Sequence, residues 1–148
     1  MLHMSPTGSQ HAFWVDELAQ QLISQLQGGA VVRIRNPLRL SKYSEPEPDL
    51  AIVRLPRQQY QNWHPHPEDV LLVIEVADAS LAFDQQIKLP LYAEQGIPAV
   101  WIVNLPDRQV ALHTAPEKGR YQFRQLVPFD APIVHPELPI RFTISDWY

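Results

Sequence analysis

Two carboxylates and one lysine have the side-chain types that a metal-assisted reaction needs. Asp49 follows Pro48 at the start of the apolar segment DLAIVRL. Glu75 lies near the end of a second apolar segment, VLLVIEV, and Lys88 lies in the segment after it. A buried carboxylate is destabilising unless it is paired, hydrogen-bonded or bound to a cation. Because Mg²⁺ binds one or two protein carboxylates together with waters and substrate oxygens, converging Asp49 and Glu75 side chains would suit it.

Each of these residues also has a purely structural interpretation. Glu75 could face an arginine at the sheet edge, since structural ion pairs also bury ionisable groups. Asp49 could start a turn, as Pro-Asp sequences commonly do. Lys88 could form an i,i+4 ion pair with Asp84 on an exposed helix face, worth roughly a few tenths of a kcal/mol. In the catalytic interpretation, Asp84 orients Lys88 and is not a metal ligand.

Hydrophobic periodicity predicts the elements that would position these side chains. The expected helices are residues 10–27 and 83–95, and the expected strands are 30–40, 49–55, 70–76, 99–105, 109–114, 120–127 and 140–144. Ser9 is the expected N-cap of the first helix, and Gly28 and Gly29 are expected to end it. The segment APEKG is expected to form a hairpin turn, and the proline-rich residues 128–139 are expected to be irregular.

The order of these elements predicts the fold class. Strands 70–76 and 99–105 are almost wholly apolar, which is typical of central strands covered on both faces. Because a helix lies between them, they are expected to form a right-handed parallel crossover. A length of 148 residues corresponds to one domain, residues 1–148. The sequence therefore predicts a single α/β or α+β domain.

The composition excludes several classes of protein. Hydrophobic residues make up 45% of the chain and charged residues 19%, which indicates a globular core. The absence of cysteine excludes a disulfide scaffold, a thiolate metal site and a cysteine nucleophile. Residues 1–12 lack the basic start and apolar run of a signal peptide, and charged, glycine and proline residues interrupt the apolar stretch 89–106. We therefore expect a cytoplasmic protein without membrane spans.

The formal net charge of −4 is distributed unevenly along the chain. Residues 1–44 carry a net charge of +2, residues 45–87 carry −6 and residues 88–148 carry 0. The whole deficit lies in the segment that contains Asp49 and Glu75, where a bound Mg²⁺ ion would offset part of it. The composition is thus compatible with a DNA substrate, but it disfavours tight DNA binding without a metal ion.

Several motifs resemble one known family. The stretches EPEPDLAIVR and PEDVLLVIEVADASLAFDQQIKLPLYAEQGIPAVWIVNL, together with the opening MSPTGSQH, are similar to the Uma-type restriction endonucleases. These proteins are abundant in cyanobacteria and have the PD-(D/E)XK nuclease fold. The resemblance extends from about Met4 to the C-terminus. It implies an α/β domain in which an N-terminal helix and a crossover helix pack on a mixed central sheet, as in restriction endonucleases.

The resemblance also implies roles for particular residues. Asp49 corresponds to the aspartate of the PD motif, and Glu75 corresponds to the acidic residue of (D/E)XK. Ala77 stands where the usual motif has a lysine, and Lys88 resembles the lysine that replaces it on the following helix. The implied activity is Mg²⁺-dependent hydrolysis of DNA phosphodiester bonds, with Mn²⁺ as an alternative ion. Asp49 and Glu75 would hold the metal, with the Val76 carbonyl as a further ligand, and Lys88 would orient the attacking water.

Two more expectations come from the same resemblance. Family members usually begin with a segment that carries an E-L-x-x-G strand before the MSP sequence, and this chain is expected to lack that segment. Nuclease-fold proteins that cut two strands usually dimerise, and exposed sheet edges favour a partner. We therefore expect a homodimer that acts on DNA.

A second group of residues could support the site. His11 lies beside the Trp14–Leu18 face of the first helix. There it either packs in the core or contacts a catalytic side chain without itself touching the metal or the substrate. Arg33, Arg35 and Arg39 are expected to share one face of the strand 30–40. Such a row either contacts a phosphate backbone or is a solvated strand face.

Further candidates lie in the expected loops. They are Glu45, Glu47, Tyr60, Trp63, His64 and His66. The two glutamates either assist metal binding or are ordinary loop charges. The two histidines resemble a metal-ligand pair, but a proline separates them and no third ligand is evident. The two aromatic residues either pack the loop or stack on a base, and packing is the favoured interpretation.

Two other functions compete with the nuclease hypothesis. One is a nuclease-like protein that has lost catalysis and serves as a binding or assembly module. The other is a small-molecule phosphohydrolase that uses the same carboxylates. Retention of Asp49, Glu75 and Lys88 favours the enzyme. The expected absence of the segment before MSP, and the lack of an overall excess of basic residues, favour the binding module. A comparison of DNA with nucleotide substrates would distinguish the phosphohydrolase.

Overall fold

The apolar strands β3 (Val70–Ala77) and β4 (Ala99–Asn104) are parallel neighbours at the centre of a six-stranded mixed sheet. The remaining strands of this sheet are β1 (Val31–Ile34), β2 (Leu50–Val53), β5 (Gln109–Glu117) and β6 (Arg120–Pro128). The spatial order is β1-β2-β3-β4-β5-β6, and every other neighbouring pair is antiparallel. All six residues of β4 are buried, as its apolar sequence predicts.

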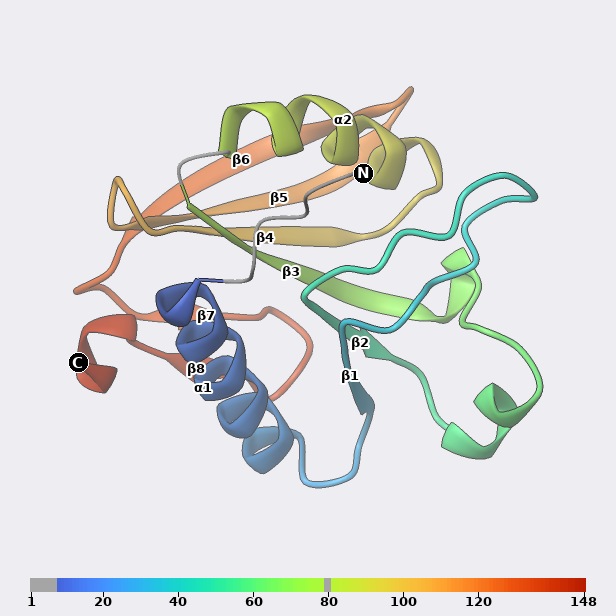
Figure 1. Cartoon of the computed structure of the whole chain (residues 1–148), viewed down its shortest axis with the longest axis horizontal. Coiled ribbons are helices and arrows are strands. Elements are labelled where there is room, and N and C mark those ends of the chain that lie inside the picture. Colours follow the sequence, from blue (N-terminus) through green and yellow to red (C-terminus); the bar gives the residue numbers. More distant parts are fainter. Residues whose placement is uncertain (1–7, 79–80) are drawn as a thin grey trace.

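This computed structural model describes residues 8–78 and 81–148, with all their side chains except those of residues 81–86 (Figure 1). The first half of the MSPTGSQH motif, residues 4–7, therefore lies outside the described residues. Within the described part of the chain, no helix is both long and apolar enough to cross a bilayer.

Helix α1 (Ser9–Leu26) confirms the helix predicted from the periodicity of residues 10–27. One face of the helix is buried against the sheet, where Leu18 and Leu22 are fully buried. The expected N-cap is wrong by one position, because Gly8 holds the cap position and Ser9 is already helical. The helix ends where Gln27 and Gly28 adopt left-handed backbone conformations, with φ of 47° and 78°.

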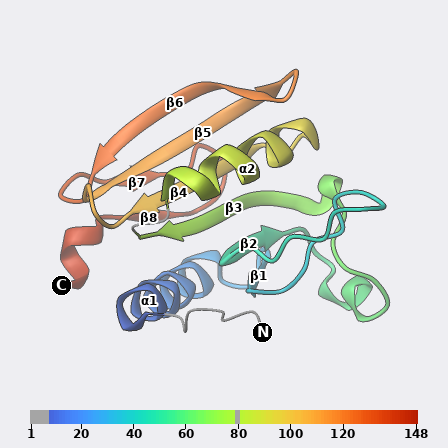
Figure 2. The same cartoon turned by 45° about the horizontal axis from the view of Figure 1, so that its top comes forward.

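The crossover between the parallel strands is made by helix α2 (Leu81–Glu94), which confirms the predicted strand–helix–strand order. Helix α2 packs on one face of the sheet with the segment that contains Leu38 and Leu40. Helix α1 covers the other face, together with a two-stranded sheet of β7 (Ile133–Val134) and β8 (Arg141–Phe142). Figure 2 shows the sheet between these two layers. The predicted mixed sheet with an N-terminal helix and a crossover helix is therefore confirmed.

Several predicted boundaries are wrong. Within the predicted strand 30–40, only β1 (Val31–Ile34) is a strand. Arg35 has a φ of 54°, and the chain leaves the sheet there. Strand β5 continues through most of APEKG, so the hairpin turn is only Lys118 and Gly119, both with positive φ. The predicted strand 140–144 is the short β8 followed by the 3₁₀-helix η3 (Ile144–Trp147). The region predicted to be irregular contains β7.

The long connection between β2 and β3 contains two short 3₁₀-helices, η1 (Arg57–Gln61) and η2 (Pro67–Asp69). In η2, the backbone N–H of His66 donates to Asp69 Oδ2 over 2.9 Å. The N–H of Arg54 donates to the carbonyl of Asp69 over 2.8 Å. These bonds hold the end of the connection against the start of β3.

Candidate active site

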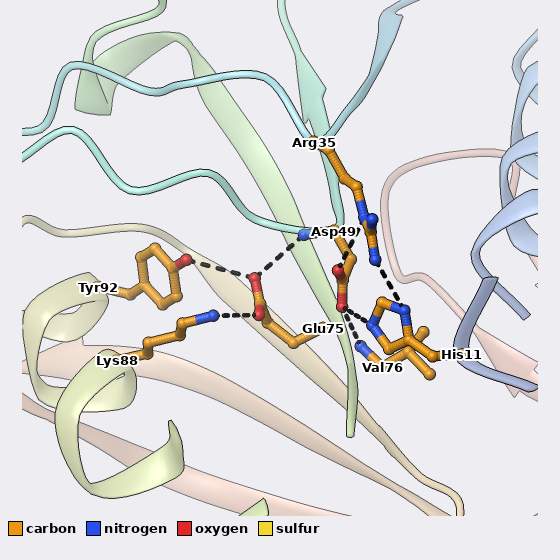
Figure 3. A network of polar contacts seen from close by, with 7 residues as sticks. All are labelled: His11, Arg35, Asp49, Glu75, Val76, Lys88 and Tyr92. Atoms are coloured by element: carbon orange, nitrogen blue, oxygen red, sulfur yellow. Dashed lines mark hydrogen bonds and ion pairs between the residues drawn. The ribbon is translucent and has the colours of Figure 1, made fainter. Parts of the chain in front are cut away.

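The register of β2 and β3 brings the two candidate carboxylates together. Leu50 pairs with Ile74 in this antiparallel ladder, so Asp49, one residue before Leu50, lies opposite Glu75. The backbone N–H of Asp49 donates to Glu75 Oε1 over 3.3 Å. Residues that are 26 positions apart in the sequence thus meet at one point of the sheet. Figure 3 shows this group of side chains.

Backbone and side-chain donors hold the Asp49 carboxylate in place. Its Oδ2 atom accepts a hydrogen bond of 2.8 Å from the N–H of Val76 and lies 3.1 Å from His11 Nε2. Its Oδ1 atom lies 3.7 Å from Arg35 Nε. The side chain is 13% exposed, so the carboxylate is largely withdrawn from water but still accessible on one side.

The contacts of His11 indicate which of its ring nitrogens accepts a hydrogen bond and which donates one. Arg35 Nη2 lies 2.8 Å from His11 Nδ1, and a guanidinium group can only donate hydrogen bonds. Nδ1 is therefore assigned as the accepting nitrogen, and in this tautomer Nε2 carries the hydrogen. His11 then donates this proton to Asp49 Oδ2. Arg35, His11 and Asp49 form a chain of directed hydrogen bonds from three separate segments.

Helix α2 approaches Glu75 from the other side, as Figure 3 shows. Lys88 Nζ lies 2.9 Å from Glu75 Oε2, and the hydroxyl of Tyr92 donates to Oε1 over 3.4 Å. Lys88 is 35% exposed and Glu75 only 12%, so the lysine reaches from solvent to a buried carboxylate. Lys88 and Tyr92 are four residues apart and therefore lie on the same side of the helix.

Burial raises the pKa of the Glu75 carboxyl, and the neighbouring charge of Asp49 raises it further. The ammonium group of Lys88 and the N–H of Asp49 oppose this rise. Burial also raises the pKa of the Tyr92 hydroxyl, so the tyrosine remains a neutral donor. The site therefore contains two carboxylates in a place where a second negative charge is unfavourable, and additional positive charge would be stabilising there.

Asp49 and Glu75 fit a hard divalent cation in their chemistry. Both supply oxygen ligands, and Mg²⁺ commonly takes one or two protein carboxylates while waters and substrate oxygens complete its shell. Among the described residues, no group of three or more histidine, aspartate or glutamate side chains is arranged to hold a metal ion. The fit therefore depends on two carboxylates and not on a cage made entirely of protein ligands.

The three candidate arginines do not form one row, so that expectation is wrong. Arg33 in β1 lies with its guanidinium 5.7 Å from the ring of Tyr60 and donates to the carbonyl of Pro37. Arg35 lies just after the strand and turns toward Asp49, as described above. Arg39 lies in the following loop, where its Nη1 atom donates to Glu45 Oε1 over 3.0 Å. The row is broken because the strand ends at Ile34.

The remaining loop candidates are dispersed. Glu47 is exposed before the buried Pro48, and the side chain of Asp84 lies outside the described residues. His64 Nε2 lies 3.9 Å from Glu45 Oε2, and His66 Nδ1 lies 3.9 Å from Glu68 Oε1. Because the two histidines face different carboxylates, they do not form the metal pair that their spacing suggested.

The two aromatic candidates of this region differ from each other. Tyr60 packs in the loop, where its hydroxyl donates to the carbonyl of Arg54 over 2.7 Å. Trp63 is 53% exposed and lines an open hollow, so the expectation that it packs the loop is wrong.

Sequence reasoning did not name Tyr92 as a site residue, and it named Arg35 for DNA contact without anticipating its contact with His11. Tyr92 contacts Glu75, and its spacing of four residues from Lys88 was the signal that could have placed it there. The contact of Arg35 with His11 depends on the left-handed backbone at Arg35, which no residue pattern indicated.

The mixed sheet with helix α1 on one face and the crossover helix α2 on the other places the chain in the class of nuclease-fold proteins. The chain belongs to the family described as "Putative restriction endonuclease", which matches residues 1–145. This assignment confirms the resemblance seen in the sequence, and the class of function that the family defines is a nuclease.

A solved structure agrees with this fold. The chain is similar to a "putative nuclease" from Anabaena variabilis ATCC 29413, with a TM-score of 0.70 and 14% sequence identity. The similarity covers 99% of this chain and 83% of the other. No curated protein matches the chain.

Proposed function

We propose that the protein is an endonuclease that hydrolyses DNA phosphodiester bonds with the help of Mg²⁺, or of Mn²⁺ as the alternative ion. The observation that carries this proposal is the meeting of Asp49, Glu75 and Lys88 at one point of the sheet. A buried carboxylate pair with an adjacent lysine is the side-chain set that metal-assisted phosphodiester hydrolysis needs. The nuclease family of the chain supports the same reaction class.

Asp49 and Glu75 would hold the metal ion, and the carbonyl of Val76 is a further candidate ligand. When bound, a divalent ion supplies Lewis-acid activation of a phosphate oxygen and lowers the pKa of a water molecule. Asp49 is preset for this role because Val76 and His11 fix its Oδ2 atom. Fixed ligands do not have to reorganise when a cation arrives.

Lys88 lies where its ammonium group could orient the attacking water. Its ammonium group lies 2.9 Å from Glu75 and is partly exposed, so it borders both the buried carboxylate and the solvent. From this position it would orient the water and stabilise the negative charge that develops on the phosphorus oxygens. Glu75 accepts a hydrogen bond from the ammonium group of Lys88, and Tyr92 donates one to the same carboxylate. These two contacts fix the position of the lysine's ammonium group.

The homodimer and the cytoplasmic location belong to the same proposal. Strand β6 is an edge strand of nine residues, and most of its side chains are exposed. Such an edge supports pairing with a second copy, which would supply the second site needed to cut both DNA strands. Light scattering on the purified protein would measure the oligomeric state directly.

Plasmid cleavage with and without Mg²⁺ tests the proposed activity. We expect wild-type protein to cut plasmid DNA only with the metal, and Asp49→Asn and Lys88→Ala to lower the rate by about 10²–10³ because each removes a charge from the reacting centre. Lys118→Ala is the matched lysine control, since Lys118 lies in the β5–β6 turn. Equal cleavage by wild type and both site variants would contradict the proposal. Hydrolysis of nucleotides without DNA cleavage would favour a phosphohydrolase, and Mg²⁺ binding that does not depend on Glu75 would favour an inactive binding module.

A further inference from the structure

A hollow of about 560 Å³ lies between two loops at the start of β3. We call it the Trp63 hollow, and its lining is Arg39, Leu40, Ser41, Lys42, Glu45, Trp63, His64, His66 and Pro67. Its volume is in the range of small-molecule binding sites. The residues assigned to the active site are absent from this lining, so the hollow is a separate feature of the molecule.

Hydrogen bonds between and within the two loops give the Trp63 hollow fixed walls. The N–H of Arg39 donates to the carbonyl of Pro65 over 2.7 Å, which joins one loop to the other. The N–H of Leu40 donates to the carbonyl of Ser44 over 3.0 Å. The side chain of Arg39 donates to Glu45 Oε1 over 3.0 Å. A ligand would therefore meet walls that are largely formed before it binds.

Trp63 presents its indole ring at this surface. The side chain is 53% exposed, whereas Trp14 and Trp101 are 7% and 2% exposed and Trp147 is partly buried. An indole is large and apolar, so leaving it in water forgoes stabilisation that packing would give. A flat exposed ring beside cationic side chains is the arrangement on which nucleic acid bases stack.

The charged groups around the ring match the other parts of a nucleotide. The cations of Arg39 and Lys42 can bind a phosphate. Glu45 has a second carboxylate oxygen, Oε2, 3.9 Å from His64 Nε2, and this oxygen can accept a hydrogen bond from the amino group of a base. A ring for stacking, cations for phosphate and an acceptor for a base edge thus occur together in one hollow.

We propose that the Trp63 hollow binds one unpaired nucleotide of the DNA substrate, with the base stacked on Trp63 and the phosphate held by Arg39 and Lys42. The nucleotide must be unpaired because both faces of a paired base inside a duplex are covered by its neighbours. This inference rests on the proposed nuclease function and specifies its substrate as DNA with a single-stranded part.

The position of the hollow relative to the active site supports a shared substrate. One loop connects them, because Arg35 and Asp49 at its two ends lie in the active site, and residues 39–42 and Glu45 between them line the hollow. The lining residue Pro67 lies shortly before the start of β3, whereas Glu75 lies near the end of this strand. Pro67 precedes Glu75 by eight residues, so the two are at most about 29 Å apart, which eight to nine stacked nucleotides of one strand would span. One bound strand can therefore reach both places.

Tryptophan fluorescence tests this inference in Lys88→Ala protein with Mg²⁺, so that cleavage does not consume the DNA. We expect oligothymidylate to quench the fluorescence of the exposed Trp63 and a blunt duplex of equal length to quench it much less. Adding Trp63→Ala or Lys42→Ala is expected to weaken single-strand binding about tenfold, measured by fluorescence anisotropy. Trp63→Phe keeps a ring and is expected to restore part of the lost affinity.

Matched controls separate the hollow from general surface effects. Phe123→Ala removes a 68% exposed aromatic ring from β6, and Lys118→Ala removes a lysine from the β5–β6 turn; neither is expected to change binding. Unchanged single-strand affinity in Trp63→Ala, equal quenching by duplex, or no binding of the single strand would each overturn the inference. Plasmid cleavage by wild-type protein reports separately on Asp49 and Glu75, so the failure of one proposal is distinguishable from the failure of the other.

Discussion

The two carboxylates of the site are held in different ways. Asp49 receives a hydrogen bond from the backbone of Val76, so the strand itself fixes its direction. Glu75 receives side-chain donors from Lys88 and Tyr92, and therefore depends on the packing of α2 against the sheet. A change in α2 is expected to disturb Glu75 more than Asp49.

Protonation of Glu75 makes the stability of the folded protein depend on pH. Burial, followed by the charge of Asp49, raises the pKa of the folded protein's Glu75 above its ordinary value of 4.5. The folded state then binds this proton more tightly than the unfolded chain does. The contribution of Glu75 to stability is thus fully present below its unfolded pKa and is lost as the pH rises through its folded pKa.

We expect Glu75→Gln to remove this loss, because glutamine has no proton to release. Thermal unfolding measured from acidic to neutral pH should show the Tm of wild type falling relative to that of the variant as the pH rises above 4.5. The ion pair with Lys88 does not reverse this trend, because the pKa of Glu75 is raised even with the lysine's opposing effect included. The exposed Glu117→Gln is the control. A constant difference between wild type and Glu75→Gln at all pH values would contradict this prediction.

The backbone at the end of β1 leaves the strand conformation and directs Arg35 toward the active site. Arg35 adopts a φ of 54°, a left-handed conformation that costs a residue with a Cβ roughly 1–2 kcal/mol. Its N–H still donates to the carbonyl of Asp49 over 3.1 Å, and its side chain reaches His11. Strained backbone of this kind is characteristic of functional positions.

We expect Arg35→Gly to lower the free energy of unfolding less than Arg33→Gly does, because glycine adopts the φ of position 35 without strain and this gain offsets the lost contacts. DNA cleavage should fall in the same variant, because His11 and Asp49 lose a positive neighbour. Arg33→Gly is the matched control and should be less stable by roughly 0.5–1 kcal/mol or more, since glycine is unfavourable within a strand. Chemical denaturation and plasmid cleavage measure the two effects. Equal destabilisation by the two glycine substitutions would count against the argument.

The charge of the whole molecule sets the conditions for binding DNA. The formal net charge is −4, and the most acidic segment, residues 45–87, contains β2, β3 and both candidate metal ligands. The negative charge of this segment disfavours the approach of a phosphate backbone, and a cation bound at Asp49 and Glu75 would offset part of that charge. Arg39 and Lys42, the cations of the Trp63 hollow, lie outside this acidic segment of the chain.

We expect affinity for DNA to increase when Mg²⁺ is added at constant ionic strength, because the ion reduces the repulsion at Asp49 and Glu75. Asp49→Asn combined with Glu75→Gln should bind DNA more tightly than wild type in the absence of Mg²⁺ and should respond less to its addition. Fluorescence anisotropy with a labelled oligonucleotide measures both effects, and a salt titration gives the number of phosphate contacts. The same affinity with and without Mg²⁺ in wild type would refute this expectation.

The local pattern of the chain was sufficient for most elements of the fold. The apolar runs at 70–76 and 99–105 predicted the central strands, and the intervening helix made their parallel pairing predictable. Boundaries were predicted less well where backbone conformation overrode residue type, as at Arg35 and in the APEKG segment. The residue types of Asp49, Glu75 and Lys88 were sufficient to nominate them as a site.

Only the tertiary structure decided which side chains meet. His11 and Asp49 are 38 residues apart, and their contact depends on how α1 packs beside the β1–β2 edge. Trp63 is exposed although its residue type favours burial, because two loops hold an open hollow around it. A sequence determines burial and periodicity within a segment through local hydrophobic pattern. Contacts between distant segments depend on strand register and helix packing, which the whole chain fixes together.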